Sequence, residues 1–240
     1  MTIAEMHTEF RLLLDKADGG TAPSFLDAEI DRLLNISQDK FISKRAFGNN
    51  LRRTSFEEDQ KRRDDLRNIV VFEKLNATSM SIDAHKPNAR IVALPESYRH
   101  MLSEEALITI NNGGEITAKR VGVKPITHDR YNKIIDDPFN KPMSDTVYRL
   151  DIGPSSGDSS TAYVELLTMP GTTISEYFVR FLKNPVQMKI GNTNASISAV
   201  ECSLAPHTHR EIVRMAVLEA LENIESPRYQ TSKIELNEIE

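Results

Sequence analysis

The sequence is poor in the residues that many binding and catalytic sites require. Its 240 residues include a single cysteine, Cys202, and no tryptophan, and aromatic residues make up only 6%. One cysteine excludes an intrachain disulfide and any metal site built from a CxxC pair. The scarcity of aromatic residues argues against a platform on which nucleic-acid bases or sugars stack.

The sequence also lacks a long apolar run and an excess of positive charge. No stretch approaches the roughly 20 apolar residues of a membrane-spanning helix, so we expect no membrane partner. The first residues, MTIAEMHTEF, carry charges where a signal peptide has its apolar stretch, which favours a protein kept or assembled in a cytoplasm. The net charge of −5 argues against binding nucleic acid over the whole surface.

The clearest structural signal that is present is the amphipathic segment from Thr208 to Ile224. Thr208 and Glu211 have the spacing of a capping box, and Pro227 ends the helix. We expect the apolar stripe of this helix to be buried against a β section. The stripe recurs at three- and four-residue spacing and contains Ile212, Val213, Ala216, Val217, Ala220, Leu221 and Ile224.

Three more helices are predicted near the start of the chain. The first begins near Ile3, with Thr2 and Glu5 spaced as a capping box. The second runs from residue 24 to about 47, where Gly-Asn-Asn is a good stop signal, and the third runs from residue 55 to about 67. These helices account for the whole region before residue 68.

The hydrophobic period changes after residue 68. Short β-rich runs separated by turn residues follow, and they are IVVFEKL, RIVAL, ALITI, EITAKRVGV, TVYRLDI, TAYVELLTM, EYFVRFL and VQMKI. The pattern predicts an α+β fold with N-terminal helices, a central antiparallel β section, a closing C-terminal helix and an extended tail. We expect a helical region at 1–68, a β-rich region at 69–203, and a closing helix with an extended arm at 204–240, packed together as one structural unit.

The candidate catalytic and metal-binding residues each have a simpler interpretation. His207 and His209 flank the predicted closing helix, but a zinc site needs further ligands in suitable geometry. Cys202 has no nucleophile signature around it, and Asp136 and Asp137 precede a proline as turn residues do. We therefore expect no catalytic site, no metal and no cofactor.

The segment from Lys44 to Arg67 is the one basic stretch, with eight Lys or Arg against five Asp or Glu. Its local charge of +3 leaves −8 on the remainder of the chain. Three interpretations remain open: a nucleic-acid contact, a solvated helix laced with ion pairs, and an interface to an acidic face of another subunit. Its candidate interface residues are Arg52, Arg53, Arg62 and Arg63.

The tail after Ser226 is predicted to be an extended arm. Pro227 ends the preceding helix, so Arg228 and Tyr229 are expected to leave in an extended direction. Ile234 and Leu236 alternate with polar residues as strand residues do. Such an arm can add a strand to the sheet edge of a neighbouring subunit.

Three segments resemble signatures of the neck proteins of tailed bacteriophages, most closely those of the crAss-like phages. They are EIDRLLNISQDKFISKRAFGNN from Glu29, ITHDRYNKIIDDPFNKP from Ile126, and CSLAPHTHREIVRMAVLEALENIESPRYQ from Cys202. They occur in the same order in one chain and cover both ends and the middle. The resemblance therefore extends over most of the protein.

The resemblance implies a structural virion protein without enzyme activity. It implies a homo-oligomeric ring in the phage neck or tail, with twelve copies like the portal. Such a head–tail connector joins the portal to the tail, contacts adjacent ring proteins, and lets DNA pass without sequence-specific binding. Its place is the virion, with assembly in the host cytoplasm. The loop at 133–144, with Phe139 and Asn140, suits contacts along the ring axis.

Two other functions remain as alternatives. A DNA-contacting accessory virion protein would use the basic segment at 44–67. A virion-associated hydrolase would need a catalytic site that the sequence does not reveal. The mass of the native particle distinguishes a ring from both, because a ring is a large multiple of 27.1 kDa.

Overall fold

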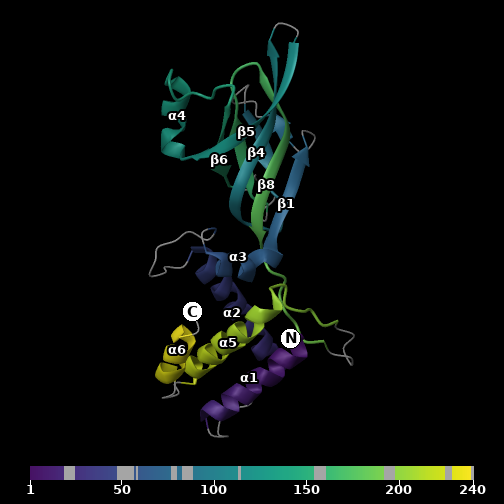
Figure 1. Ribbon diagram of the computed structural model, residues 1–240, viewed down its shortest axis with the longest axis vertical. Helices are drawn as coiled ribbons and strands as arrows, with labels where there is room; N and C mark the ends of the chain where they lie inside the picture. The colour runs from purple at the N-terminus through teal and green to yellow at the C-terminus, as the bar shows by residue number, and fades with distance from the viewer. Residues whose placement is uncertain are drawn as a thin grey trace. The chain divides into compact units, whose positions relative to one another are not determined.

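The computed structural model describes residues 1–18, 25–47, 57, 59–76, 80–82, 89–112, 115–153, 161–191, 198–224 and 229–238. The chain forms two compact units, which we call the helical unit and the β unit. The helical unit combines both ends of the chain, Met1–Ile69 and Pro185–Glu240, whereas the β unit is the continuous stretch Val70–Asn184 (Figure 1). The described helices and strands confirm the α+β class.

The helical unit is built around α5, the predicted closing helix. Its elements are α1 (Ile3–Asp18), α2 (Asp27–Phe47), α3 (Gln60–Leu66), a 3-10 turn (Arg67–Ile69), a second 3-10 turn (Pro206–Thr208), α5 (His209–Asn223) and α6 (Tyr229–Glu238). The predicted stripe of α5 is buried, and Ala216 is fully inaccessible. The prediction that the β section covers this stripe is wrong. Helices α1 and α2 cover it, and their own apolar side chains complete the same core.

Of the two predicted capping boxes, one is confirmed and one is wrong. At the start of α1, the Thr2 amide donates to Glu5 Oε2 (3.0 Å) and the Glu5 amide donates to Thr2 Oγ1 (3.3 Å). Thr208 instead has a helical backbone conformation and donates its hydroxyl to the Ala205 carbonyl (2.8 Å). Glu211 is engaged by Arg45 and does not reach back to the helix start.

Helix α3 starts later than predicted. Asp59 is its N-cap and accepts a hydrogen bond from the Lys61 amide (3.0 Å), so the helix begins at Gln60. The predicted start at Ser55 lies outside the described residues. A carboxylate two residues before a backbone N–H satisfies one of the donors that a helix start leaves unpaired.

The extended arm is a wrong prediction for residues 229–238, which form helix α6 beside α5. The alternation of Ile234 and Leu236 is too short to outweigh the helix propensity of the glutamine, lysine, glutamate and leucine in the segment. Packing against α5 adds the tertiary support that a helix of this length needs. Ile234 remains 61% exposed on the outer side.

The β unit contains one eight-stranded sheet with the order β1-β8-β4-β5-β6-β7-β3-β2. The strands are β1 (Val70–Asn76), β2 (Met80–Ile82), β3 (Ala89–Ala93), β4 (Tyr98–Asn112), β5 (Glu115–Ile126), β6 (Thr146–Ile152), β7 (Tyr163–Leu167) and β8 (Thr172–Lys183). Seven of the predicted runs correspond to strands of this sheet. VQMKI does not: it lies in the helical unit, where Lys189 forms an isolated bridge with Val200.

Neighbouring strands are antiparallel except for β5 and β6, which are parallel. Helix α4 (His128–Asp136) connects these two strands, because a parallel pair needs a crossover and cannot be joined by a tight turn. Part of the loop predicted at 133–144 is therefore helical. The sequence signal was the spacing of Tyr131 and Ile134, which lie on one side of α4 and are half-buried.

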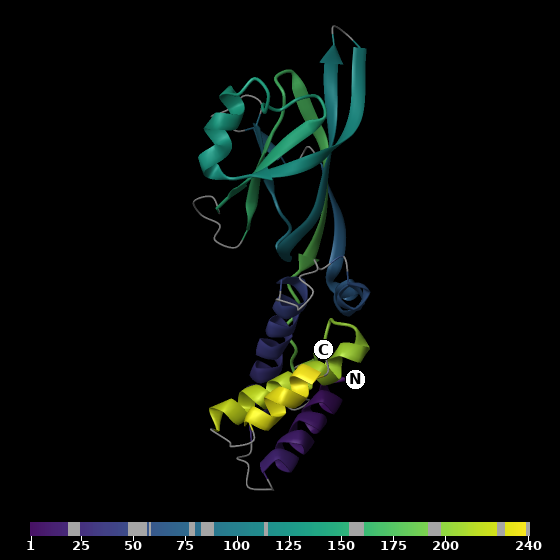
Figure 2. The same ribbon diagram turned by 60° about the vertical axis from the view of Figure 1, so that its left-hand side comes forward.

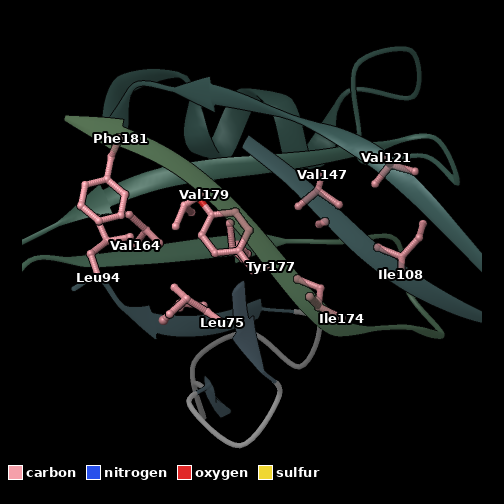
Figure 3. Packing of buried hydrophobic residues seen from close by; sticks show 13 residues of the cluster. Leu75, Leu94, Ile108, Val121, Val147, Val164, Ile174, Tyr177, Val179 and Phe181 are labelled. Atoms are coloured by element: carbon pink, nitrogen blue, oxygen red, sulfur yellow. The ribbon is translucent and has the colours of Figure 1, made fainter. Parts of the chain in front are cut away.

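The sheet curls on itself. Strands β1 and β2 are at opposite ends of the strand order, yet only three residues separate Asn76 from Met80. Four Cα steps span at most about 15 Å, so the two ends of the sheet must lie close together. The core fills the inside of this curl, with the fully buried Tyr177 among aliphatic side chains from seven strands (Figure 3).

The hairpin of β4 and β5 extends beyond the rest of the sheet (Figure 2). Residues 116–120 are all exposed, and Ile116 is 70% exposed. Before Gly122, where pairing with β6 begins, the described part of β5 has β4 as its strand partner. The β5 side of the hairpin is thus exposed and mostly polar, whereas β4 stays paired with β8 as far as Ile110.

Candidate functional site

A buried charge cluster joins three helices of the helical unit. Arg45 lies one turn after Phe41 on the inward stripe of α2, and its guanidinium carbon is 5.0 Å from the centre of the Phe41 ring. Its Nη2 donates to both carboxylate oxygens of Glu211 on α5 (2.8 and 2.9 Å). Its Nε lies 2.9 Å from Oδ2 of Asp65 on α3. The side chains of Arg45 and Asp65 are only 4% and 3% exposed.

Both carboxylates of this cluster have partners within the chain. Besides its contact with Arg45, Asp65 lies 2.8 Å from Nε2 of His207. The contact between Arg45 Nε and Asp65 is an ion pair, not an aligned hydrogen bond. A buried pair of this kind adds little net stability over an apolar core, but removing one partner is costly because the other charge stays buried.

A hollow of about 290 Å³ opens beside the cluster. Its lining residues are Lys61, Asp65, His207, Thr208, Arg210, Glu211 and Arg214. The acidic side chains of the wall are paired, whereas Arg210 is 76% exposed in its side chain and Arg214 is exposed. The hollow therefore has a basic rim over a floor whose two carboxylates already have partners, which suits an anionic group and not a cation.

The two histidines considered as metal ligands point to different partners. His207 is 58% exposed in its side chain and contacts Asp65. His209 is buried, with its ring nitrogens 3.0 Å from the Met1 carbonyl and 3.1 Å from the Leu204 carbonyl. Within the residues that the structure describes, no group of three or more His, Cys, Asp or Glu could hold a metal ion.

The environment of Cys202 does not activate its thiol. Burial raises the pKa of Cys202, so the thiol stays protonated at neutral pH. Gln38 Nε2 is its neighbour, 3.9 Å from the sulfur. A reactive cysteine needs the opposite, a lowered pKa beside a cation or a helix N-terminus.

The loop after α4 is built to display Phe139, which is 84% exposed. Asp137 accepts hydrogen bonds from the Phe139 amide (2.9 Å) and from Nδ2 of Asn140 (2.6 Å). These two donors, the Phe139 amide first, lower the pKa of Asp137. The Tyr148 hydroxyl donates to the Asn140 carbonyl (2.8 Å) and ties the loop to β6. An exposed aromatic side chain on an ordered loop is a typical anchor for a protein partner.

A second charge cluster lies inside the β unit. Glu104 on β4 accepts from the Tyr177 hydroxyl and pairs with Arg149 on β6, which also contacts the exposed Asp151 (3.1 Å). Burial is the main cause that raises the pKa of Glu104, against the opposing effects of Tyr177 and Arg149. Burial and the neighbouring Glu104 raise the pKa of Tyr177. The cluster faces the core, so it connects strands and offers no surface to a ligand.

The other predicted interface residues are spread over the helical unit. Arg62 is 6% exposed and Arg63 is exposed, so the basic segment is not one solvated face. Tyr229 is half-buried under Lys233, whose Nζ lies 5.7 Å from the ring centre, and Leu236 is half-buried. Arg52, Arg53 and Arg228 lie outside the described residues.

Sequence reasoning missed the cluster of Arg45, Asp65 and Glu211. The available signal was an arginine at a core position of the α2 stripe, four residues after Phe41. A charge placed on an apolar stripe requires a buried partner. The identity of that partner was not readable, because Asp65 and Glu211 are 20 and 166 residues away.

None of the described helices is long and apolar enough to span a membrane. Two curated relatives are similar over nearly the whole chain. "Ring protein 4/5" of Bacteroides phage crAss001 is 24% identical over 229 residues, covering 90% of this chain and 91% of that protein. "Ring protein 3" of the same phage is 24% identical over 227 residues, covering 90% and 94%. The model of the phage tail ring protein 3/4 family matches residues 1–232, and the chain therefore belongs to that family of crAss-like phage ring proteins.

Proposed function

We propose that this protein is one subunit of a homo-oligomeric ring in the phage neck and tail, with twelve copies like the portal. The family match over residues 1–232 is the observation that carries the proposal. The ring stacks on the portal or on adjacent ring proteins, assembles in the host cytoplasm, and has no catalytic role. Its function is to connect the head to the tail and to let the DNA pass.

The charge distribution supports a passage for DNA. The β unit has 13 Lys or Arg against 14 Asp or Glu, and the helical unit has 17 against 21, giving net charges of −1 and −4. Neither unit therefore has a basic excess that would hold phosphates. A duplex moving through a ring of such subunits would meet little electrostatic retention.

The Phe139 loop supports a contact between subunits. Phe139 is the most exposed of the large apolar side chains that the structure describes, and Asp137 holds its loop in one conformation. A ring needs two different complementary surfaces on each subunit, joined head to tail. A loop whose backbone is already tied by hydrogen bonds loses less conformational entropy when the ring forms.

Imaging of intact virions and native mass measurement of the purified chain test this proposal together. The expected results are a ring of this protein between head and tail, and particles whose mass is a large multiple of 27.1 kDa, in solution or on a neighbouring ring. Phe139→Ala is expected to weaken assembly, and Phe72→Ala, at a 58% exposed phenylalanine of β1, is the matched control. A particle without this protein, or a monomer that binds duplex DNA with a steep salt dependence, would favour the accessory DNA-binding alternative.

A further inference from the structure

The outer row of α5 changes its charge from one end to the other. Arg210, Arg214, Leu218 and Glu222 are four residues apart and so form one row along the helix. Arg214 and Glu222 are both exposed. Within the described residues, neither has an ion pair or hydrogen bond through its side chain. Among the described residues, the helix therefore has a positive charge near its start and a negative charge near its end that have no partner.

The positive end is a shaped site. The hollow beside Arg45 is rimmed by Arg210 and Arg214, and its volume of about 290 Å³ admits the end of a carboxylate side chain. Glu9 lies 3.5 Å from Arg210 but leaves it 76% exposed, so the rim keeps its positive charge toward solvent. On this wall Glu211 pairs with Arg45, whose Nη2 donates to both of its oxygens, so much of its negative charge is balanced away from the rim.

The negative end lies too far along the same helix to pair with this site within one chain. Glu222 follows Arg210 by twelve positions, which is about 18 Å at 1.5 Å per residue. A head-to-tail contact between identical subunits joins two different patches, one from each subunit. Opposite charges at the two ends of one exposed helix row meet this requirement.

We propose that the hollow at the start of α5 receives the Glu222 carboxylate of a second copy of this chain. This inference rests on the proposed ring and names one of its contacts. The carboxylate pairs with Arg214 and Arg210 at the rim, while the buried cluster of Arg45, Asp65 and Glu211 fixes the floor of the site. A phosphate of the passing DNA is the competing occupant of the same basic rim.

A charge swap in the phage tests the contact. Virions carrying Arg214→Glu, Glu222→Arg or both changes are compared with the parent by counting complete tails in electron micrographs and infectious particles. Each single change places like charges together and is expected to reduce complete particles by about tenfold or more. The double change restores opposite charges and is expected to return the yield to within about threefold of the parent.

Arg32→Glu is the matched control, because Arg32 is exposed in the same unit and, within the described residues, has no ion pair. It is expected to leave the yield unchanged. Melting of each purified chain, followed by circular dichroism, shows whether a variant folds. If a charge reversal unfolds the chain, the variants Arg214→Gln, Glu222→Gln and their combination are used in its place. The double neutral variant is then expected to lose no more complete particles than either single variant.

Two results would overturn the inference. One is a double variant that assembles no better than the single variants. The other is normal assembly of Arg214→Glu together with loss of binding to a 20-base-pair duplex at low salt, which would assign the rim to phosphate. Failure of the proposed ring can be distinguished from failure of this contact, because parent virions would then contain no ring of this protein.

Discussion

Different interactions position the segments of the helical unit and those of the β unit. In the β unit, one continuous stretch forms the sheet, and backbone pairing sets the position of each strand. In the helical unit, segments from both ends of the chain must find each other, and side chains make the specific ties. Asp31 on α2 accepts from the Ile190 amide (3.1 and 3.2 Å), and Asn35 exchanges hydrogen bonds with the backbone of Met188. A discontinuous unit therefore depends more on single polar side chains.

The change with the largest expected effect is Ala216→Asp. It would place an unpaired charge where α5 meets α1 and α2, at a fully buried position, and should cost about 3 kcal/mol or more. Thermal melting by circular dichroism is the measurement, with Asn223→Asp at the exposed end of α5 as control. An unchanged melting temperature would show that the stripe of α5 is not a core.

Removal of an arginine from each charge cluster compares the two units directly. Arg45→Met removes the guanidinium that two carboxylates share, leaving Glu211 without its cation and the buried Asp65 with its contact to His207, and should cost about 3 kcal/mol. Arg149→Met should cost less, about 2 kcal/mol, because the side chain of Asp151 is 70% exposed and Glu104 keeps the Tyr177 hydroxyl. Urea unfolding of both variants gives the two values.

The control for Arg45→Met adds Asp65→Asn and Glu211→Gln, which remove the unpaired charges and should recover most of the loss. If Arg45→Met and Arg149→Met lower the free energy of unfolding equally, the two units do not differ in their dependence on the buried arginine. A smaller loss for Arg45→Met than for Arg149→Met would reverse the expected order.

Tyr177→Phe is expected to have a smaller effect, about 1 kcal/mol, from the loss of one hydrogen bond to Glu104. Its pH dependence has a definite sign. The pKa of Tyr177 is raised in the folded state above its usual 10.0, so its contribution is fully present below that pH and is lost as pH rises through the folded value. Unfolding measured between neutral pH and about pH 11 should show a smaller alkaline loss in the variant than in the parent.

The smallest expected effect on stability comes from Asp137→Ala, at an exposed loop. The change removes the acceptor for the Phe139 amide and for Asn140, so the loop should lose its order while the melting temperature shifts by less than about 2 °C. The pKa of Asp137 is lowered from 3.8, so its contribution is present above that pH and lost as pH falls through the folded value. The amide resonance of Phe139 should report both changes, and an unchanged resonance would contradict them.

The local elements were largely readable from the sequence. The α5 stripe and the Thr2–Glu5 capping box depend on spacings of three and four residues, and seven strands depend on short β-rich runs. The predictions failed where the local sequence allowed two conformations and tertiary contacts favoured the other one. Residues 229–238 became helix beside α5, and Thr208 lost its box because Arg45 holds Glu211.

Sequence alone was enough to predict the α+β class, the burial of the α5 stripe and the resemblance to phage neck proteins, because these depend on short-range periodicity and on linear motifs. Three features became visible only in three dimensions: both chain ends form one unit, the sheet curls with β5 parallel to β6, and Asp65 and Glu211 share Arg45. Contacts of this kind join residues up to 208 positions apart, as between Met1 and His209. Hydrophobic periodicity specifies which face of an element is buried, but it carries no information about which distant element covers that face.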